Sequence, residues 1–181
     1  LSNGHAGVAL YAILEKNGLI KKGVGEILNV HPDRNVKLNI HVSTGSLGQG
    51  LPIAVGIALA NRNKNVYCMI SDGECAEGSI WESLSLAYYL IIVNANGWGA
   101  YDPIYITHLF KRIKAFGLKV IKVEGHDYKF LQKILKIKTV NKPLVVFAKT
   151  TVEQLPFLKG QDAHYYIMKD EDYRLALELL K

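Results

Sequence analysis

The sequence predicts an α/β fold with three layers, in which a doubly wound, mostly parallel sheet lies between helices on both faces. Short apolar runs alternate along the chain with longer segments whose apolar residues recur at helical spacing. This alternation is typical of parallel strands joined by crossover helices. No repeat, low-complexity tract or proline-rich linker divides the 181 residues, so we expect a single domain covering residues 1–181.

The apolar runs and the periodic segments give the expected order of elements. Strands are predicted at 66–70, 91–93, 120–123 and 144–148. Helices are predicted at 5–17, 47–61, 79–90, 104–116, 128–138 and 170–180. Gly18 and Gly117 are expected to end the first and fourth helices. Asp170 is expected to cap the last helix.

The first two helices carry expectations about burial. In the first helix, Val8 and Leu14 fall on one face, which is expected to be buried. Either Leu10 or Tyr11 completes that face. The second helix is small and apolar nearly all round, which is typical of a helix that is buried on every side.

Two places indicate that part of a larger domain is missing from the chain. Leu1–Gly4 has the pattern of a strand end that meets a helix, so the chain is expected to begin inside a larger fold. Near 90–91 the predicted helix runs directly into the next strand, although such connections normally contain a few loop residues. Either a short segment is missing there or the connection is rebuilt.

The charge of the chain restricts the classes of function. The formal net charge is +6 and the pI is about 9.2. Lysines of the second half alternate with apolar residues: Lys111, Lys114, Lys119, Lys122, Lys129, Lys133, Lys136 and Lys138. Such spacing is typical of a solvated face, and it lacks the clustered arginines and aromatic partners of a nucleic-acid surface. Some of this charge can attract phosphorylated substrates.

The sequence indicates neither export nor membrane insertion. It has no signal-peptide pattern and no apolar run long enough to span a bilayer. Cys68 and Cys75 give neither a disulfide framework nor the spacing of metal ligands. We therefore expect a cytoplasmic protein.

Polar residues follow two successive predicted strands. Asp72 and Gly73 come after the first strand, and Asn96 follows the second. Ligands of parallel sheets bind beyond the carboxyl ends of the strands, and the helix that follows Gly73 favours anions at its start. A carboxylate and an amide oxygen could complete the oxygen shell of Mg²⁺ with phosphate oxygens, a backbone carbonyl and water. Taken alone, Asp72-Gly73 and Asn96-Gly97 are each an ordinary turn signal.

Asp72-Gly73 followed by Asn96 resembles the thiamine-diphosphate signature, which opens on Gly-Asp-Gly and closes on Asn. Further stretches resemble transketolases in the same order: Ser2-Asn3-Gly4-His5-Ala6, His31-Pro32-Asp33, Thr44-Gly45-Ser46-Leu47-Gly48-Gln49-Gly50, Gly125-His126-Asp127 and Ala148-Lys149-Thr150. The chain is identified by these motifs as similar to the cofactor-binding half of a transketolase. The resemblance covers nearly the whole chain.

The resemblance implies a set of site residues. Those that would bind thiamine diphosphate are Gly45, Ser46, Leu47, Gly48, Asp72, Gly73, Glu74 and Asn96. Those that would hold Mg²⁺, or Ca²⁺ in its place, are Asp72, Asn96 and the backbone carbonyl of Trp98. Those with catalytic roles would be His5, His31, Glu77 and His164, with Glu77 at a subunit interface. Without the resemblance, a lone histidine is more often structural, and His41, His108 and His126 are assigned that role.

The resemblance also implies an activity and an assembly. A transketolase moves a two-carbon ketol unit from a ketose, often a ketose phosphate, to an aldose acceptor. Its pyrimidine-binding domain supplies an activating glutamate, and nothing in this chain resembles that domain. We therefore expect a partner subunit that carries it, homodimer contacts, an α₂β₂ assembly, and no nucleic-acid or membrane partner. Alternatives are a related thiamine-diphosphate enzyme of sugar or secondary metabolism, and a non-catalytic interaction subunit.

Three features depart from the family pattern. Ser71 replaces the leading glycine of the signature, and Thr151–Pro156 replaces a glycine-rich stretch. The separation of Asp72 and Asn96 is 24 positions (96 − 72), which is shorter than in the family. A real deletion there would call the metal site into question and favour the non-catalytic alternative.

Overall fold

Four parallel strands form the only sheet in the part of the chain that the structure describes. The structure is a computed structural model, and it describes residues 1–86, 89–99, 101–137 and 143–180. The strands are β1 (Tyr67–Ser71), β2 (Leu90–Ala95), β3 (Lys119–Glu124) and β4 (Leu144–Lys149). Their order across the sheet is β1-β2-β4-β3, and every neighbouring pair is parallel. All four predicted strands are confirmed.

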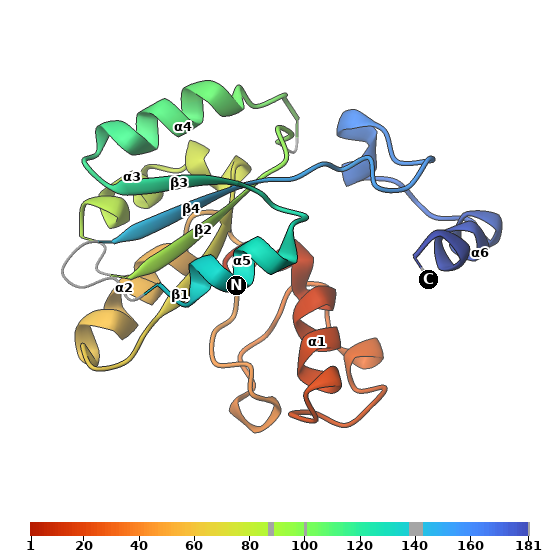
Figure 1. Cartoon of the computed structure of the whole chain (residues 1–181). Helices are drawn as coiled ribbons and strands as arrows, with labels where there is room; N and C mark the ends of the chain where they lie inside the picture. The colour runs from red at the N-terminus through yellow and green to blue at the C-terminus, as the bar shows by residue number, and fades with distance from the viewer. Residues whose placement is uncertain (87–88, 100, 138–142, 181) are drawn as a thin grey trace.

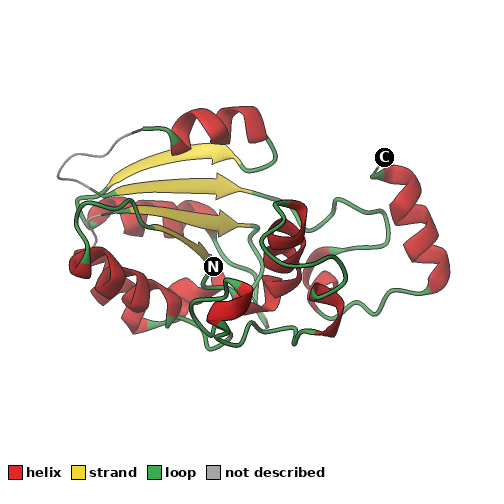
Figure 2. Ribbon diagram, turned by 90° about the horizontal axis from the view of Figure 1, so that it is seen from below, coloured by secondary structure: helices red, strands yellow, loops and turns green. Residues whose placement is uncertain are grey.

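Helices cover both faces of the sheet, as Figures 1 and 2 show. The α-helices are α1 (Gly7–Lys16), α2 (Gly50–Ala60), α3 (Gly78–Ser85), α4 (Ile106–Ala115), α5 (Tyr128–Leu135) and α6 (Asp170–Leu179). Helices α2, α3 and α4 pack in one core with residues such as Phe147 of β4, and α5 packs on the opposite face against residues such as Val146. Successive residues of a strand point to opposite faces, so β4 contributes to both cores. The predicted three-layer α/β fold is confirmed.

Among the residues that the structure describes, five short 3₁₀ segments connect or precede these elements: Gly4–Ala6, Gly25–Ile27, Val36–Leu38, Gly73–Ala76 and Gly160–His164. Helix α4 ends as predicted before Gly117, whose φ of 76° is the left-handed conformation that stops a helix. Helix α5 ends at Leu135, before the predicted end at Lys138, and Lys138 itself lies outside the described residues. The other seven lysines of the predicted solvated face are exposed.

Helix α1 belongs to a small core beside the sheet. Tyr11 and Leu14 are buried there together with Ile20 and Ile40. The prediction that Val8 shares this buried face is wrong, because its side chain is 64% exposed. The start of the chain is joined to the sheet by the Ser2 N–H, which donates to the Met69 carbonyl at 2.8 Å.

Helix α2 differs from the prediction in two ways. It begins at Gly50, not at 47, because Gly48 has a φ of 76° and cannot be part of a helix. It is also not buried on every side, since Ile53 is 38% and Ile57 48% exposed. Leu51 and Val55, on the other face, are buried in the main core.

The end of α3 and the start of β2 differ from the prediction. The helix predicted at 79–90 ends at Ser85, and positions 87–88 lie outside the described residues. Leu90 is not helical, because it pairs with Tyr67 in the sheet and donates its N–H to the Val66 carbonyl at 3.3 Å. Sheet pairing therefore places Leu90 in a strand, although helical periodicity alone would place it in the helix.

Helix α6 lies away from the sheet at the end of an extended segment (Figure 1). Asp170 is its first residue and Lys169 its N-cap, so the prediction that Asp170 caps this helix is wrong. Asp172 takes that task, because its carboxylate accepts the Lys169 N–H at 2.9 Å.

Within the described residues, no helix combines the length and the apolar character that crossing a membrane requires. Cys68 and Cys75 are free and buried. Burial raises the pKa of the Cys68 thiol to about 11 and that of Cys75 to about 12, so neither forms a thiolate readily.

Candidate functional site

The carboxyl ends of β1 and β2 bring Asp72 beside the segment that begins at Asn96. Asp72 is 2% exposed. Its Oδ1 accepts the N–H of Gly73 at 3.0 Å, and its Oδ2 accepts the N–H of Gly97 at 2.7 Å. The Asn96 side-chain oxygen accepts the Trp98 N–H at 2.8 Å. The shortened connection therefore does not separate the two strand ends that the sequence predicted to form one site.

The electrostatics of Asp72 suit a bound cation. Burial raises the pKa of its carboxyl, and the N–H groups of Gly97 and Gly73 act in the opposite direction. A carboxylate oxygen that accepts one hydrogen bond still has a free lone pair. A divalent cation at this position would supply the positive charge that a buried carboxylate requires.

The segment after Asn96 is a compact turn that contains Trp98. The Ile104 N–H donates to the Gly97 carbonyl at 2.7 Å, and Trp98 forms an isolated antiparallel β-bridge with Pro103. The Trp98 ring lies under the turn at Gly160, where a Cβ atom would be 3.2 Å from ring atom Cζ2. This packing gives the large side chain of Trp98 a structural role.

The glycine-rich loop 44–50 lies against the first residues of α3. The Ser79 hydroxyl donates to the Gly48 carbonyl at 2.8 Å. A Cβ atom on Gly48 would lie 2.7 Å from Cβ of Glu77, so only glycine fits this contact at this φ. Ser46, Leu47 and Glu77 are exposed beside the loop. Their exposure leaves them accessible to a ligand or to another chain.

The tertiary structure gathers three histidines from distant parts of the chain. The rings of His5 and His164 lie 5.6 Å apart between centroids. The ring of His31 packs on Gly45, where a Cβ atom would be 3.0 Å from its Cγ. Partial burial, followed by the nearby His164, lowers the pKa of His5, while Glu74 acts to raise it. A largely neutral His5 can accept a proton near neutral pH.

Glu74, predicted as a cofactor-binding residue, is buried at 1% exposure. Its Oε1 accepts the Ser2 hydroxyl at 2.5 Å and the Gly48 N–H at 3.1 Å. Its Oε2 accepts the Ser71 N–H at 3.0 Å. The hydroxyl of Ser71, which replaces the usual glycine, accepts the Glu74 N–H at 3.2 Å. The serine at this position therefore adds a hydrogen bond that supports the turn.

Two buried oxygens near the loop lack a hydrogen-bond partner among the described residues. They are Oδ1 of Asn3 and Oγ1 of Thr44. The next residue, Gly4, lies directly on the loop, since a Cβ atom there would be 2.5 Å from the Gly45 nitrogen. Unpartnered buried polar atoms are uncommon in proteins and are often completed by a ligand or water. They fit a polar cofactor held at this loop.

The described residues include no group of three or more His, Cys, Asp or Glu side chains placed to hold a metal ion by themselves. The predicted donor set of Asp72, the Asn96 amide and the Trp98 carbonyl is different, because it would need ligand oxygens to complete it. Such a set fits Mg²⁺ bound through phosphate and water. It does not fit a structural metal that the protein alone encloses.

The stretch that replaces the family's glycine-rich segment is held by His126. The Thr151 N–H donates to His126 Nε2 at 3.1 Å, and the Gln154 side chain contacts the other ring nitrogen at 3.0 Å. The Thr150 hydroxyl donates to the Asn94 side chain at 2.7 Å. His126 has the structural role that was assigned to it from sequence.

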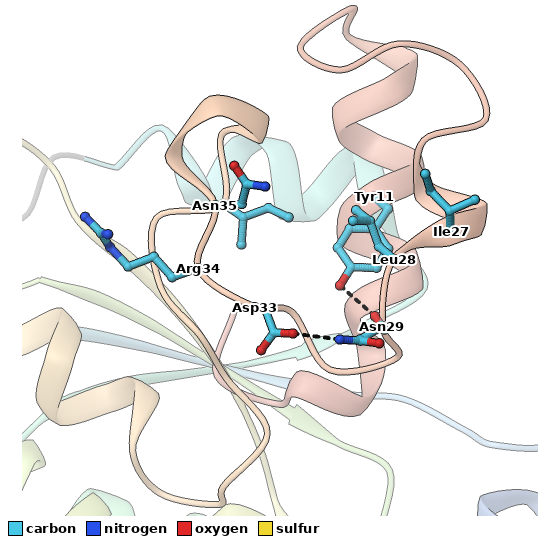
Figure 3. Close-up of a pocket in the computed structure, with 8 residues that line it drawn as sticks. Tyr11, Ile27, Leu28, Asn29, Asp33, Arg34 and Asn35 are labelled. Carbon is cyan, nitrogen blue, oxygen red and sulfur yellow. Dashed lines mark hydrogen bonds between the residues drawn. The ribbon is translucent and has the colours of Figure 1, made fainter.

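A pocket lies next to α1 (Figure 3). It has a volume of about 170 Å³ and is lined in part by Tyr11, Asn29 and Asp33. The Tyr11 hydroxyl donates to the Asn29 carbonyl at 2.8 Å, and the Asn29 amide to Asp33 at 2.7 Å. These groups bind one another, and sequence reasoning gave no signal for the pocket.

A model of the family described as transketolase, thiamine diphosphate binding domain, matches residues 1–178. The chain belongs to the transketolase family. The match covers the glycine-rich loop, the Asp72 turn and all three clustered histidines. The family resemblance predicted from the motifs is therefore confirmed, and the chain is a thiamine-diphosphate-binding domain of the transketolase type.

The relatives of this chain include proteins named as transketolases or transketolase-like, and one named as a transketolase subunit. One subunit of the apulose-4-phosphate transketolase of Actinobacillus succinogenes is 33% identical over 204 residues, covering 99% of this chain and 74% of that protein. The transketolase of Homo sapiens is 35% identical over 174 residues, covering 83% of this chain and 27% of that protein. Transketolase-like protein 2 of Mus musculus is 35% identical over 176 residues, covering 83% of this chain and 28% of that protein. The match thus spans about three quarters of the bacterial relative and about a quarter of the other two.

Proposed function

We propose that the chain is the cofactor-binding subunit of an enzyme that transfers a two-carbon ketol unit from a ketose, or ketose phosphate, to an aldose acceptor. The observation that carries this proposal is the position of buried Asp72 at the strand ends, hydrogen-bonded to the segment of Asn96. Glu74 accepts the N–H groups of Gly48 and Ser71, which ties the glycine-rich loop to the turn that carries Asp72. Membership of the transketolase family supports the reaction type.

The cofactor would lie between the glycine-rich loop and the strand ends. Asp72, the Asn96 amide and the Trp98 carbonyl would hold Mg²⁺ or Ca²⁺, which would in turn hold the diphosphate. Gly73 and the loop residues Gly45, Ser46, Leu47 and Gly48 would approach the cofactor closely. Bound thiamine diphosphate supplies the chemistry of C–C cleavage, and the protein binds and orients it.

The histidines would act on the sugar. His5, His31 and His164 would hydrogen-bond donor hydroxyls and accept or donate protons at their ring nitrogens. Their origin in three separate segments would let them surround a substrate from several sides. The lowered pKa of His5 keeps its imidazole neutral and able to accept a proton.

A partner chain would complete the site. The relative in Actinobacillus succinogenes is itself named as one subunit of a transketolase, which supports a division of this kind of enzyme into two chains. The partner would carry the pyrimidine-binding domain, and two copies of each would form an α₂β₂ heterotetramer. Glu77, exposed beside Gly48, would contact a neighbouring chain. Free buried cysteines support a reducing, cytoplasmic location.

Binding and turnover test this proposal separately. The purified chain should bind thiamine diphosphate in a Mg²⁺-dependent manner by calorimetry, yet cleave no ketose until a chain with a pyrimidine-binding domain is added. Turnover by the single chain would refute the need for a partner. Failure to bind the cofactor, alone and with the partner, would refute the cofactor site.

A further inference from the structure

The buried carboxylate of Glu74 is the meeting point of three segments that build the site. It accepts three hydrogen bonds from its own chain, from the Ser2 hydroxyl and from the N–H groups of Gly48 and Ser71. Two of these donors are far away in sequence, at separations of 72 and 26 positions. Local secondary structure therefore cannot explain these contacts.

Each of the three donors belongs to a segment with a role in the proposed site. Ser2 lies three residues before His5. Gly48 is part of the glycine-rich loop. Ser71 precedes Asp72. One carboxylate thus joins the segment of a proposed proton-transfer group, the segment that would cradle the cofactor and the segment that would hold the metal.

The contacts of Glu74 suit a residue that holds segments of the protein together and not one that binds a ligand. All three of these partners donate to its carboxylate, and both of its oxygens are engaged. Hydrogen bonds to a carboxylate are about twice as strong as neutral ones. A carboxylate would also repel a diphosphate placed directly against it.

We propose that Glu74 is a positioning residue that fixes the segments 2–5, 44–50 and 71–72 in their binding arrangement before the cofactor arrives. This inference rests on the proposed function for the identity of the ligand. Preorganisation reduces the ordering that binding must otherwise bring about. Loss of the Glu74 contacts should therefore weaken cofactor binding, even though Glu74 would not touch the cofactor.

Two variants remove the contacts in different ways, and a third controls for charge. Glu74→Gln keeps one acceptor oxygen and replaces the other with an NH₂ group. At least one of the three donors is therefore left unpaired. Ser2→Ala removes only the link to the first segment. Glu82→Gln removes the same charge from an exposed position on α3 and serves as the matched control.

Calorimetry with thiamine diphosphate and Mg²⁺ gives the first readout, at a temperature well below the melting point of every variant. Glu74→Gln should raise Kd by roughly tenfold or more, on the scale of residues that support ligands indirectly. Ser2→Ala should raise Kd less, and Glu82→Gln should leave Kd unchanged. Because Ser2 and Glu74 share one contact, the double variant should lose less affinity than the sum of the single losses.

Hydrogen exchange of the ligand-free chain gives the second readout. Glu74→Gln should speed exchange in peptides that cover 2–7, 44–50 or 71–74, according to which donor loses its acceptor, while peptides of β4 keep their protection. A residue with a merely structural role would instead lower protection throughout, and the folded fraction would bind with unchanged Kd. A Kd for Glu74→Gln within twofold of the original, or unchanged exchange in all three segments, would overturn the proposal.

The two readouts separate this inference from the proposed function. If the original chain binds no thiamine diphosphate, alone and with its partner, the proposed function fails, and exchange of 2–7, 44–50 and 71–74 still decides the role of Glu74. If Glu74→Gln does not fold, Ser2→Ala decides. In that variant, faster exchange confined to 2–7 with weaker cofactor binding supports positioning, and unchanged exchange with unchanged Kd contradicts it.

Discussion

The Asp72 carboxylate accepts the backbone N–H of Gly97 at 2.7 Å, across 25 positions of sequence and between the ends of two neighbouring strands. A second contact runs in parallel, since the Asp72 N–H donates to the Asn94 carbonyl at 3.0 Å. These bonds hold the carboxylate next to the segment that carries Asn96. The ends of β1 and β2 are therefore tied directly to each other at this point.

Asp72→Asn should abolish Mg²⁺-dependent binding of thiamine diphosphate. The amide has a similar shape but lacks the charge that attracts a divalent cation. A loss of about 3 kcal/mol or more is expected for removing one partner of a buried charge pair, which corresponds to a Kd about 100-fold higher or more. Calorimetry with and without Mg²⁺ measures the effect.

The control for Asp72 is Glu82→Gln, which removes an exposed acidic charge from α3. It should leave Kd unchanged, because surface charges at a distance are screened by salt. If Asp72→Asn binds the cofactor with the original affinity and the original Mg²⁺ dependence, Asp72 is not the metal ligand.

His5→Ala and His31→Ala should reduce turnover of the assembled enzyme more than they affect folding. A positioned acid or base contributes about 10²-fold or more to kcat. A purely structural histidine would instead leave a partner unsatisfied and cost about 1–3 kcal/mol of stability. Measuring kcat and thermal unfolding on the same preparations distinguishes the two.

His41→Ala provides the comparison, because His41 is exposed and has no assigned role in the reaction. It should turn over like the original enzyme. If His5→Ala and His31→Ala melt early but keep normal kcat when folded, the assignment of these two histidines to the reaction is wrong.

The lowered pKa of His5 predicts a specific pH dependence of stability. Partial burial and His164 disfavour the charged imidazole in the folded chain, so the unfolded chain binds the proton more readily below pH 6.5. The contribution of His5 to stability is complete above pH 6.5 and falls as the pH drops towards its folded pKa. His5→Gln should flatten this part of the profile in thermal unfolding experiments.

NMR titration tests the cause of that shift. In His164→Gln, the pKa of His5 should rise towards 6.5, because one neighbouring positive charge is removed. It should stay below 6.5, since partial burial is the larger cause. An unchanged His5 titration would show that the two rings do not interact in solution.

Phe147→Ala should strongly destabilise the domain. Phe147 is fully buried in the main core, and the ring of Phe110 meets it edge-on with centroids 5.4 Å apart. Removing a buried phenyl ring leaves a cavity and costs about 3–5 kcal/mol. Chemical denaturation measures this loss. Tyr128→Ala, at a side chain that is 67% exposed, should change stability by about 0.5 kcal/mol or less.

Local patterns in the sequence were sufficient to predict the fold class, the four strands and the strand ends at which Asp72 and Asn96 lie. Apolar strand runs and helical periodicity involve residues close together in the chain, so they can be followed along it. The same locality explains the errors. Helical spacing continued to 90, but Leu90 pairs with Tyr67 of a strand more than twenty positions away. The exposed face of α2 could not be predicted for the same reason, because a pattern of apolar residues does not say what covers them.

The way in which the parts of the site meet could be known only from the packed chain. Packing placed His164 beside His5, seated Trp98 under the turn at Gly160, and brought Ser2 to the carboxylate of Glu74. These contacts depend on where the crossover connections return the chain, and on buried polar groups finding partners wherever the fold brings them. No spacing in the sequence records such distances, because residues far apart in a chain become neighbours only when the layers pack.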